Sequence, residues 1–238
     1  MRGSTAADWR AFLDRCRRRC LDRWLEFLLP RACARCGKAV APDRVWCGAC
    51  AGALPRLPTG VGPRSPASLA TWVAEVAYEG EWEQWIHRFK YPRRGLAGLD
   101  ARPDAIVSAL AADAAARLPE PRPPVVVPVP IHPLRLRARG FHPAGVLAEA
   151  VARTLAARCV HGALVTTRPV ASQTGLDRAA RRRNVHEAFA ARPGFAAPRQ
   201  VVLVDDVVTT GATLAACARA LRRAGARRIH AVCVARKL

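Results

Sequence analysis

Apolar residues in 71–238 follow two patterns. Some form short continuous runs, and others recur singly every three or four residues. Continuous runs bounded by turn residues are typical of buried strands, and the longer spacing is typical of helices with one packed face. The expected strands lie at 71–78, 124–130, 163–168, 200–205 and 228–235, and the expected helices at 80–90, 103–118, 143–158 and 212–224. This alternation predicts an α/β fold, with a mostly parallel sheet flanked by helices.

Residues 1–30 carry a helical pattern of their own. Apolar side chains recur at three- and four-residue steps from Trp9 to Leu28, and arginines occupy the opposite face. This pattern predicts an amphipathic amino-terminal helix. Packing on the same chain is one role for it, and contact with a partner or a membrane surface is another.

Composition indicates a domain boundary at 57–68, which is rich in Pro, Gly and Ser. Residues 31–56, before this boundary, are dense in cysteine, and residues 69–238, after it, carry the strand and helix pattern. A chain of 238 residues can bury one ordinary core and a small accessory module. We therefore expect a small module at 31–56, a linker and a larger α/β domain.

Two Cys-x-x-Cys pairs in the small module, separated by ten residues, predict a metal site formed by Cys33, Cys36, Cys47 and Cys50. Two such pairs offer four thiolates to one tetrahedral ion, so the spacing predicts structural Zn²⁺. The alternative is a pair of redox dithiols, but a redox Cys-x-x-Cys usually opens a helix in a thioredoxin-like βαβ unit. That context is absent from the sequence.

The chain is strongly basic, with a formal net charge of +21 at pH 7. A positive surface attracts phosphates and polynucleotides before any specific contact forms. The alternative is that abundant arginine and alanine reflect a GC-rich genome. Four tryptophans offer stacking surfaces for bases or side chains for the core: Trp46, Trp72, Trp82 and Trp85.

Targeting signals are absent from the sequence. Charged residues interrupt the first segment, so it lacks the apolar stretch of a signal peptide, and no run reaches the roughly 18 apolar residues that a membrane span needs. We expect a cytoplasmic protein without a membrane span. Nine cysteines in such a chain favour metal ligation or buried thiols over a disulfide framework.

The most informative segment begins with the continuous apolar strand 201–204, which delivers Asp205 and Asp206 to its carboxyl end. Ligands bind at this end of the strands in open α/β sheets. A loop then opens the helix at 212–224, and it consists of Thr209, Thr210, Gly211, Ala212 and Thr213. Free amides and hydroxyls at a helix start suit a phosphate monoester, and ribose hydroxyls suit paired carboxylates. The segment therefore predicts a pocket for a phosphorylated ribose. The alternative is that the acids and the Thr-Gly turn only cap the helix.

This run of residues resembles the ribose-phosphate signature of type I phosphoribosyltransferases. The resemblance implies that Asp205 and Asp206 hold the ribose hydroxyls and stabilise charge on the sugar during catalysis. It also implies that the loop at 209–213 binds the 5′-phosphate, and that Mg²⁺ accompanies phosphoribosyl pyrophosphate.

Further features extend the resemblance over residues 33–236. They are the four cysteines, the segment Phe89-Lys90-Tyr91, the strand ending in Ile131-His132, the arginines at 135–139, and Gln173, Arg181, Asn184 and Phe189. Together they resemble the ComF family of competence proteins. Where that family usually has Asn-Gln after Gly-Phe, this chain has His142-Pro143.

We expect basic segments of the chain to bind the pyrophosphate. An arginine-rich loop at 135–139 suits pyrophosphate oxygens, and residues 172–184 suit a lid over the site, unless they are a solvated basic loop. Lys90 and His132 are further candidates, although a histidine next to a proline is more often structural. The candidate binding residues outside the Asp-Asp and Thr-Gly segment are Arg135, Arg139, Gln173, Arg181 and Lys90.

Two classes of function follow from the resemblance. The favoured one is an accessory protein for uptake and processing of single-stranded DNA in natural transformation, with a pocket for phosphoribosyl pyrophosphate and a helicase-like partner. The alternative is an active phosphoribosyltransferase of nucleotide metabolism or salvage, whose acceptor the sequence does not identify. The residues alone leave open whether the protein is an enzyme.

Overall fold

The computed structural model describes residues 32–41, 44–59, 68–92, 102–119, 125–167 and 188–238. It divides into two units, Met1–Leu54 and Pro55–Leu238. The helix expected at 1–30 and the candidate lid at 172–184 lie outside the described residues. Within the described residues, no helix combines the length and the apolar character needed to cross a membrane.

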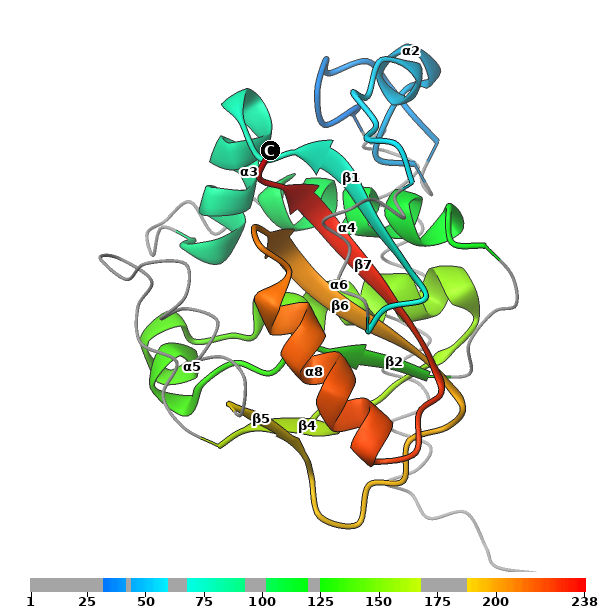
Figure 1. Cartoon of the computed structure of the whole chain (residues 1–238). Helices are drawn as coiled ribbons and strands as arrows, with labels where there is room; N and C mark the ends of the chain where they lie inside the picture. The colour runs from blue at the N-terminus through cyan, green and yellow to red at the C-terminus, as the bar shows by residue number, and fades with distance from the viewer. Residues whose placement is uncertain (1–31, 42–43, 60–67, 93–101, 120–124, 168–187) are drawn as a thin grey trace, which may run out of the picture. The chain divides into compact units, whose positions relative to one another are not determined.

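The larger unit is built on a five-stranded sheet (Figure 1). In spatial order its strands are β1 (Thr71–Ala77), β7 (Arg228–Arg236), β6 (Gln200–Val208), β2 (Val125–Pro128) and β3 (Arg158–Cys159). Each neighbouring pair is parallel, which confirms the predicted fold class. The run 201–204 is fully buried, as a strand covered on both faces requires.

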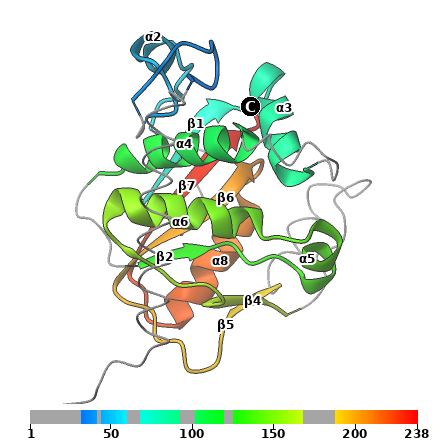
Figure 2. The ribbon, with the colours of Figure 1, turned by 180° about the vertical axis from the view of Figure 1, so that it is seen from behind.

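Helices cover both faces of this sheet. Helices α4 (Arg102–Ala116) and α6 (Pro143–Leu155) lie on one face, and α8 (Ala212–Arg223) lies on the other (Figures 1 and 2). Leu147 and Val151 of α6 are fully buried and one turn apart, so this helix packs one apolar stripe on the sheet. Helix α3 (Gly80–Lys90) follows β1 and ends at Lys90.

The strand expected at 163–168 does not join the parallel sheet. Strand β4 (Leu164–Thr166) pairs with β5 (Phe189–Ala191) in a separate antiparallel sheet of two strands. The sequence pattern did not predict β5. A strand of three residues carries too little alternation to be recognised, and its pairing depends on a partner distant in sequence.

The prediction of an arginine-rich loop at 135–139 is wrong, because these residues belong to helix α5 (Pro133–Arg139). His132 caps the helix by accepting a hydrogen bond from the Leu134 amide, and Gly140 ends it in the left-handed region. The apolar side chains of α5 are exposed and two residues apart, so they lack the helical spacing that would have identified it.

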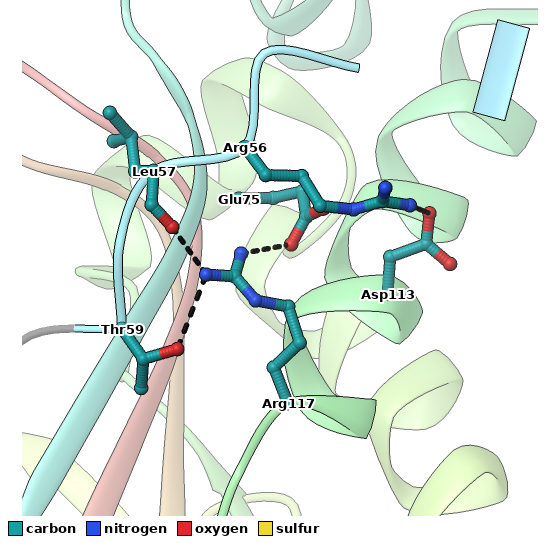
Figure 3. Close-up of polar contacts among 6 residues, drawn as sticks. All are labelled: Arg56, Leu57, Thr59, Glu75, Asp113 and Arg117. Atoms are coloured by element: carbon teal, nitrogen blue, oxygen red, sulfur yellow. Dashed lines mark hydrogen bonds and ion pairs between the residues drawn. The ribbon is translucent and has the colours of Figure 1, made fainter. Parts of the chain in front are cut away.

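A buried carboxylate on β1 ties the start of the larger unit to α4 (Figure 3). Glu75 is fully buried, and each of its oxygens lies 2.8 Å from an arginine nitrogen, one from Arg56 and one from Arg117. Arg117 also donates hydrogen bonds to the Leu57 carbonyl oxygen and to the Thr59 hydroxyl. The network thus holds the segment that enters the domain against the chain just beyond α4.

Candidate functional site

The smaller unit brings the four predicted metal ligands together. The sulfur atoms of Cys33, Cys36, Cys47 and Cys50 lie within 4.8 Å of one another. The Cys36 and Cys47 sulfurs are 3.6 Å apart, close to the roughly 3.8 Å between two thiolates on a tetrahedral zinc with Zn–S bonds of about 2.3 Å. The cluster therefore fits a structural zinc site, as the spacing predicts.

Local backbone favours the thiolate at Cys33 and at Cys47. Burial acts to raise the pKa of the Cys33 thiol, but hydrogen bonds from backbone amides outweigh it and lower the pKa to about 6. The Cys50 amide donates to the Cys47 sulfur at 3.5 Å and lowers the pKa of that thiol. Gly37 turns the chain in the left-handed region, with φ of 75°. Amides directed at sulfur are typical of zinc knuckles.

In the larger unit, a cavity of about 370 Å³ lies at the carboxyl ends of β2 and β6. Its lining includes the predicted acids, the predicted loop and three predicted cations, namely Asp205, Asp206, Thr209, Thr210, Gly211, Ala212, Thr213, Lys90, Arg135 and Arg139. The other two candidates, Gln173 and Arg181, lie outside the described residues. One cavity therefore collects residues from distant parts of the chain.

The two acids lie within β6 rather than after it. The strand was expected to end at 205 but continues to Val208, because β7 is long enough to keep pairing with it there. The Asp206 amide donates to the Asp205 carboxylate at 2.9 Å, and the Val207 amide donates to the Asp206 carboxylate at 2.6 Å. Backbone hydrogen bonds thus orient both side chains.

The acids differ in their electrostatic surroundings. The Lys90 ammonium lies 2.8 Å from the Asp206 carboxylate, and both side chains are largely buried. Burial and the nearby Asp206 charge raise the pKa of Asp205 to about 7, although Lys90 acts in the opposite direction. The Asp205 carboxyl group can therefore gain or lose its proton near neutral pH when a ligand enters.

The loop after β6 presents the amino terminus of α8 to the cavity. Gly211 adopts φ of 72°, a left-handed conformation that a side chain disfavours. No side chain caps the helix at this glycine, and the Ala212 amide makes only a long hydrogen bond of 3.4 Å to the Thr210 hydroxyl. The helix start thus offers amides and hydroxyls suited to an anion.

Helix α5 supplies the cationic side of the cavity. Arg139 donates to the Tyr91 hydroxyl at 3.1 Å, and its guanidinium carbon lies 4.8 Å from the centre of the Tyr91 ring. Tyr91 is 55% exposed, so this pair lies at the protein surface. By contrast, Trp46, Trp72 and Trp82 are buried in their own units, which makes them core residues rather than stacking surfaces.

His142, where the chain departs from the family pattern, has a structural role at the cavity wall. Its Nε2 donates to the Val129 carbonyl oxygen at 2.8 Å, and burial lowers its pKa, so the neutral ring is favoured. Pro143 follows as the first residue of α6. A Cβ at Gly145 would lie 3.0 Å from the His142 ring, so this glycine leaves room for it.

Sequence reasoning missed several residues that line the cavity. Tyr78 directly follows β1, so its place at a strand's carboxyl end would have identified it. Thr166 and Phe189 come from the small sheet, and only its pairing brings them to the cavity. His132, by contrast, was a candidate from the sequence, and it lines the cavity in addition to capping α5.

A parallel sheet with this acid pair and Thr-Gly loop defines a type I phosphoribosyltransferase domain, and the family model for the phosphoribosyl transferase domain matches residues 139–238. DNA utilization protein YhgH of Escherichia coli O6:H1 is 30% identical over 210 residues, which are 87% of this chain and 90% of that protein. The chain belongs to the ComF family of phosphoribosyltransferase-like proteins.

Two further proteins are similar over shorter stretches. Competence protein F of Haemophilus influenzae is 33% identical over 110 residues, which are 45% of this chain and 48% of that protein. The solved glutamine phosphoribosylpyrophosphate amidotransferase from B. subtilis is 22% identical with a TM-score of 0.41, over 61% of this chain and 30% of that enzyme.

Proposed function

We propose that this ComF-type chain serves DNA utilization and binds phosphoribosyl pyrophosphate in the cavity at the end of β6. The observation that carries the proposal is that one cavity of about 370 Å³ is lined by both the acid pair and the loop at the start of α8. Acids for hydroxyls and amides for a phosphate are the two contacts that a ribose 5-phosphate requires.

Each group in the cavity has a proposed role. Asp205 and Asp206 accept hydrogen bonds from the ribose hydroxyls, and the loop at 209–213 donates to the 5′-phosphate. Arg135 and Arg139 attract the pyrophosphate, since guanidinium groups match phosphate oxygens in geometry and charge. Gln173 and Arg181 complete the site from the proposed lid.

Mg²⁺ is proposed to enter together with the pyrophosphate. Mg²⁺ takes oxygen ligands and commonly combines one or two carboxylates with phosphates of the substrate. Asp205 and Asp206 provide carboxylate oxygens in the same cavity, so the residues present fit this ion. When bound, the ion neutralises charge on the pyrophosphate.

Calorimetry of the full chain with phosphoribosyl pyrophosphate and Mg²⁺ tests the binding proposal. We expect binding heat for the wild type and roughly a hundredfold weaker binding for Thr209→Val/Thr210→Val, because each lost hydroxyl removes about 1.5 kcal/mol of hydrogen bonding to a charged phosphate. Thr154→Val, a threonine of α6 outside the cavity, is the matched control and should bind like the wild type. Absence of heat in the wild type would contradict the proposal.

A second candidate function is phosphoribosyl transfer. The observation that favours it is that Lys90, Arg135 and Arg139 line the same cavity as the acids, and cations there suit a departing pyrophosphate. In this step the bond from ribose C1 to pyrophosphate oxygen breaks, a C1–N bond forms, and the nitrogen loses a proton. Pyrophosphate released in the same mixtures after an amine acceptor is added would favour the enzyme, and binding without release would favour a binding module.

A role with single-stranded DNA is proposed from the relatives' names and the net charge of +21. Affinity for a single-stranded oligonucleotide should fall steeply with salt. Replacing Arg135, Arg137 and Arg139 together with glutamine should reduce the salt slope by about two, at roughly 0.7 per phosphate contact. Fluorescence anisotropy over a salt series measures this slope.

The matched control for the DNA experiment uses arginines near the amino-terminal ends of the strands, opposite the ends that face the cavity. Arg199 precedes β6, Arg228 opens β7, and Arg223 ends α8, and all three are exposed. Replacing these three with glutamine removes the same charge away from the cavity. Equal slopes for the two triple variants would show that charge alone, and not α5, determines the affinity.

A further inference from the structure

A second group of metal-ligating side chains lies where α6 meets the edge strand β3. Glu149 belongs to α6, Cys159 ends β3, and His161 follows two residues later. Their ligand atoms all lie within 4.8 Å of one another. None of the three lines the cavity, and none belongs to the four-cysteine cluster.

Both neighbours of the histidine approach the same ring nitrogen. His161 Nε2 lies 2.6 Å from the Glu149 carboxylate and 3.5 Å from the Cys159 sulfur. A catalytic Cys-His-acid relay uses opposite nitrogens of the ring, one toward the nucleophile and one toward the acid. This group is therefore not arranged as a relay. Donor atoms that converge on one point are arranged as ligands around an ion.

The distances agree with a tetrahedral ion. Zinc bonds of about 2.3 Å to sulfur and about 2.0 Å to nitrogen place these two ligands about 3.5 Å apart, and Cys159 and His161 already have this separation. A zinc ion also needs the carboxylate oxygen about 3.3 Å from the nitrogen. To make room for the ion, the Glu149 carboxylate has to move away from the His161 nitrogen by less than the length of one covalent bond. The Glu149 side chain is exposed and can make this movement.

The backbone that carries the three ligands is well anchored. The Val160 amide, between Cys159 and His161, donates to the Val126 carbonyl oxygen of β2 at 2.9 Å. On α6, Ala148 and Ala150 on either side of Glu149 are buried. A ligand set on a fixed backbone loses little conformational entropy when it binds an ion.

We propose that Glu149, Cys159 and His161 form a second site for Zn²⁺, with a fourth position open to water or another ligand. Thiolate and imidazole together select a borderline-soft ion and disfavour Mg²⁺ and Ca²⁺. The ion ties the two-residue edge strand β3 to α6, and both elements also flank β2. This site is independent of the phosphoribosyl pyrophosphate proposal.

Zinc content of the full chain at buffered free Zn²⁺, measured by plasma mass spectrometry, tests this site. Cys159→Ser/His161→Gln should hold one zinc fewer per chain than the wild type, because the four-cysteine cluster remains. The matched control is Glu83→Gln/His87→Gln, on an exposed face of α3, and it should hold as much zinc as the wild type. Equal zinc in the wild type and the Cys159 variant overturns the proposal.

Two further measurements guard against a variant that fails to fold. Glu149→Gln keeps the size of the side chain and should weaken zinc binding at this site by more than the roughly tenfold that loss of a ligand's hydrogen-bond partner costs, because it removes a charged ligand. In the wild type, Zn²⁺ should slow alkylation of Cys159, as followed by peptide mass spectrometry, and the protection should be lost in His161→Gln. Alkylation of Cys159 at the same rate with and without Zn²⁺ also overturns the proposal.

Discussion

Asp205→Asn is expected to stabilise the ligand-free protein above neutral pH while abolishing phosphoribosyl pyrophosphate binding. Burial and Asp206 raise the pKa of Asp205 in the folded protein from 3.8 to about 7. A raised carboxyl pKa means that the folded state holds the proton more tightly than the unfolded chain. The stability that this proton contributes is complete below about pH 4 and is lost as the pH rises to about 7.

The expected size follows from the same linkage. A gap of about three pKa units corresponds to about 4 kcal/mol of stability lost by the wild type between about pH 4 and pH 7, at about 1.4 kcal/mol per unit. Asparagine does not titrate, so Asp205→Asn should gain up to this amount over the wild type at about pH 8 and little at about pH 4. Urea unfolding at both pH values measures the difference.

Asp206→Asn is the matched control, and its effect on stability should have the opposite sign. Asp206 is paired with the Lys90 ammonium at 2.8 Å, so its loss leaves a largely buried cation without that carboxylate. Both variants should lose ligand binding, because each removes a charged acceptor for a ribose hydroxyl. If Asp205→Asn proves no more stable than the wild type at about pH 8, the electrostatic account of the acid pair is wrong.

Arg117→Met is expected to lower the free energy of unfolding by about 3 kcal/mol, because it leaves a fully buried carboxylate with one arginine in place of two. Arg117 is 23% exposed and binds Glu75, the Leu57 carbonyl oxygen and the Thr59 hydroxyl, so one substitution removes three contacts. Methionine keeps the length of the aliphatic stem. Denaturant unfolding measures the loss.

Two companion variants separate the charge effect from general damage. Arg137→Met, on the exposed face of α5, should change stability by no more than about 0.5 kcal/mol. Glu75→Gln/Arg117→Met should recover part of the loss, because Glu75→Gln removes the buried charge that Arg117→Met leaves underpaired. A double variant whose losses simply add would contradict this explanation.

The sequence predicted the parts of the molecule that depend on short-range pattern. Strand β6 was recognised because four consecutive apolar residues need burial on both faces, and the four cysteines because zinc imposes a ligand spacing. The loop at 209–213 was placed at the start of α8 because glycine and hydroxyl residues together are typical of a helix start that can bind a phosphate. Each of these patterns lies within one short, continuous stretch of the chain.

Other features were missed because they depend on contacts between distant segments. The Lys90 pair with Asp206 joins residues from α3 and β6, and no local pattern relates them. The small sheet of β4 and β5 also reaches the cavity only through the packed fold. The cluster of Glu149, Cys159 and His161 has the same origin, since α6 and β3 meet only in three dimensions.

The sequence by itself therefore determined the α/β class, the four-cysteine cluster and the position of the Asp-Asp and Thr-Gly segment between a strand and a helix, because hydrophobic periodicity and ligand spacing act within short stretches of chain. Tertiary structure alone decided the unequal environments of the two acids, the buried Glu75 network and the partners of His161. Burial and charge pairing depend on which distant side chains become neighbours, and only the packed chain specifies them.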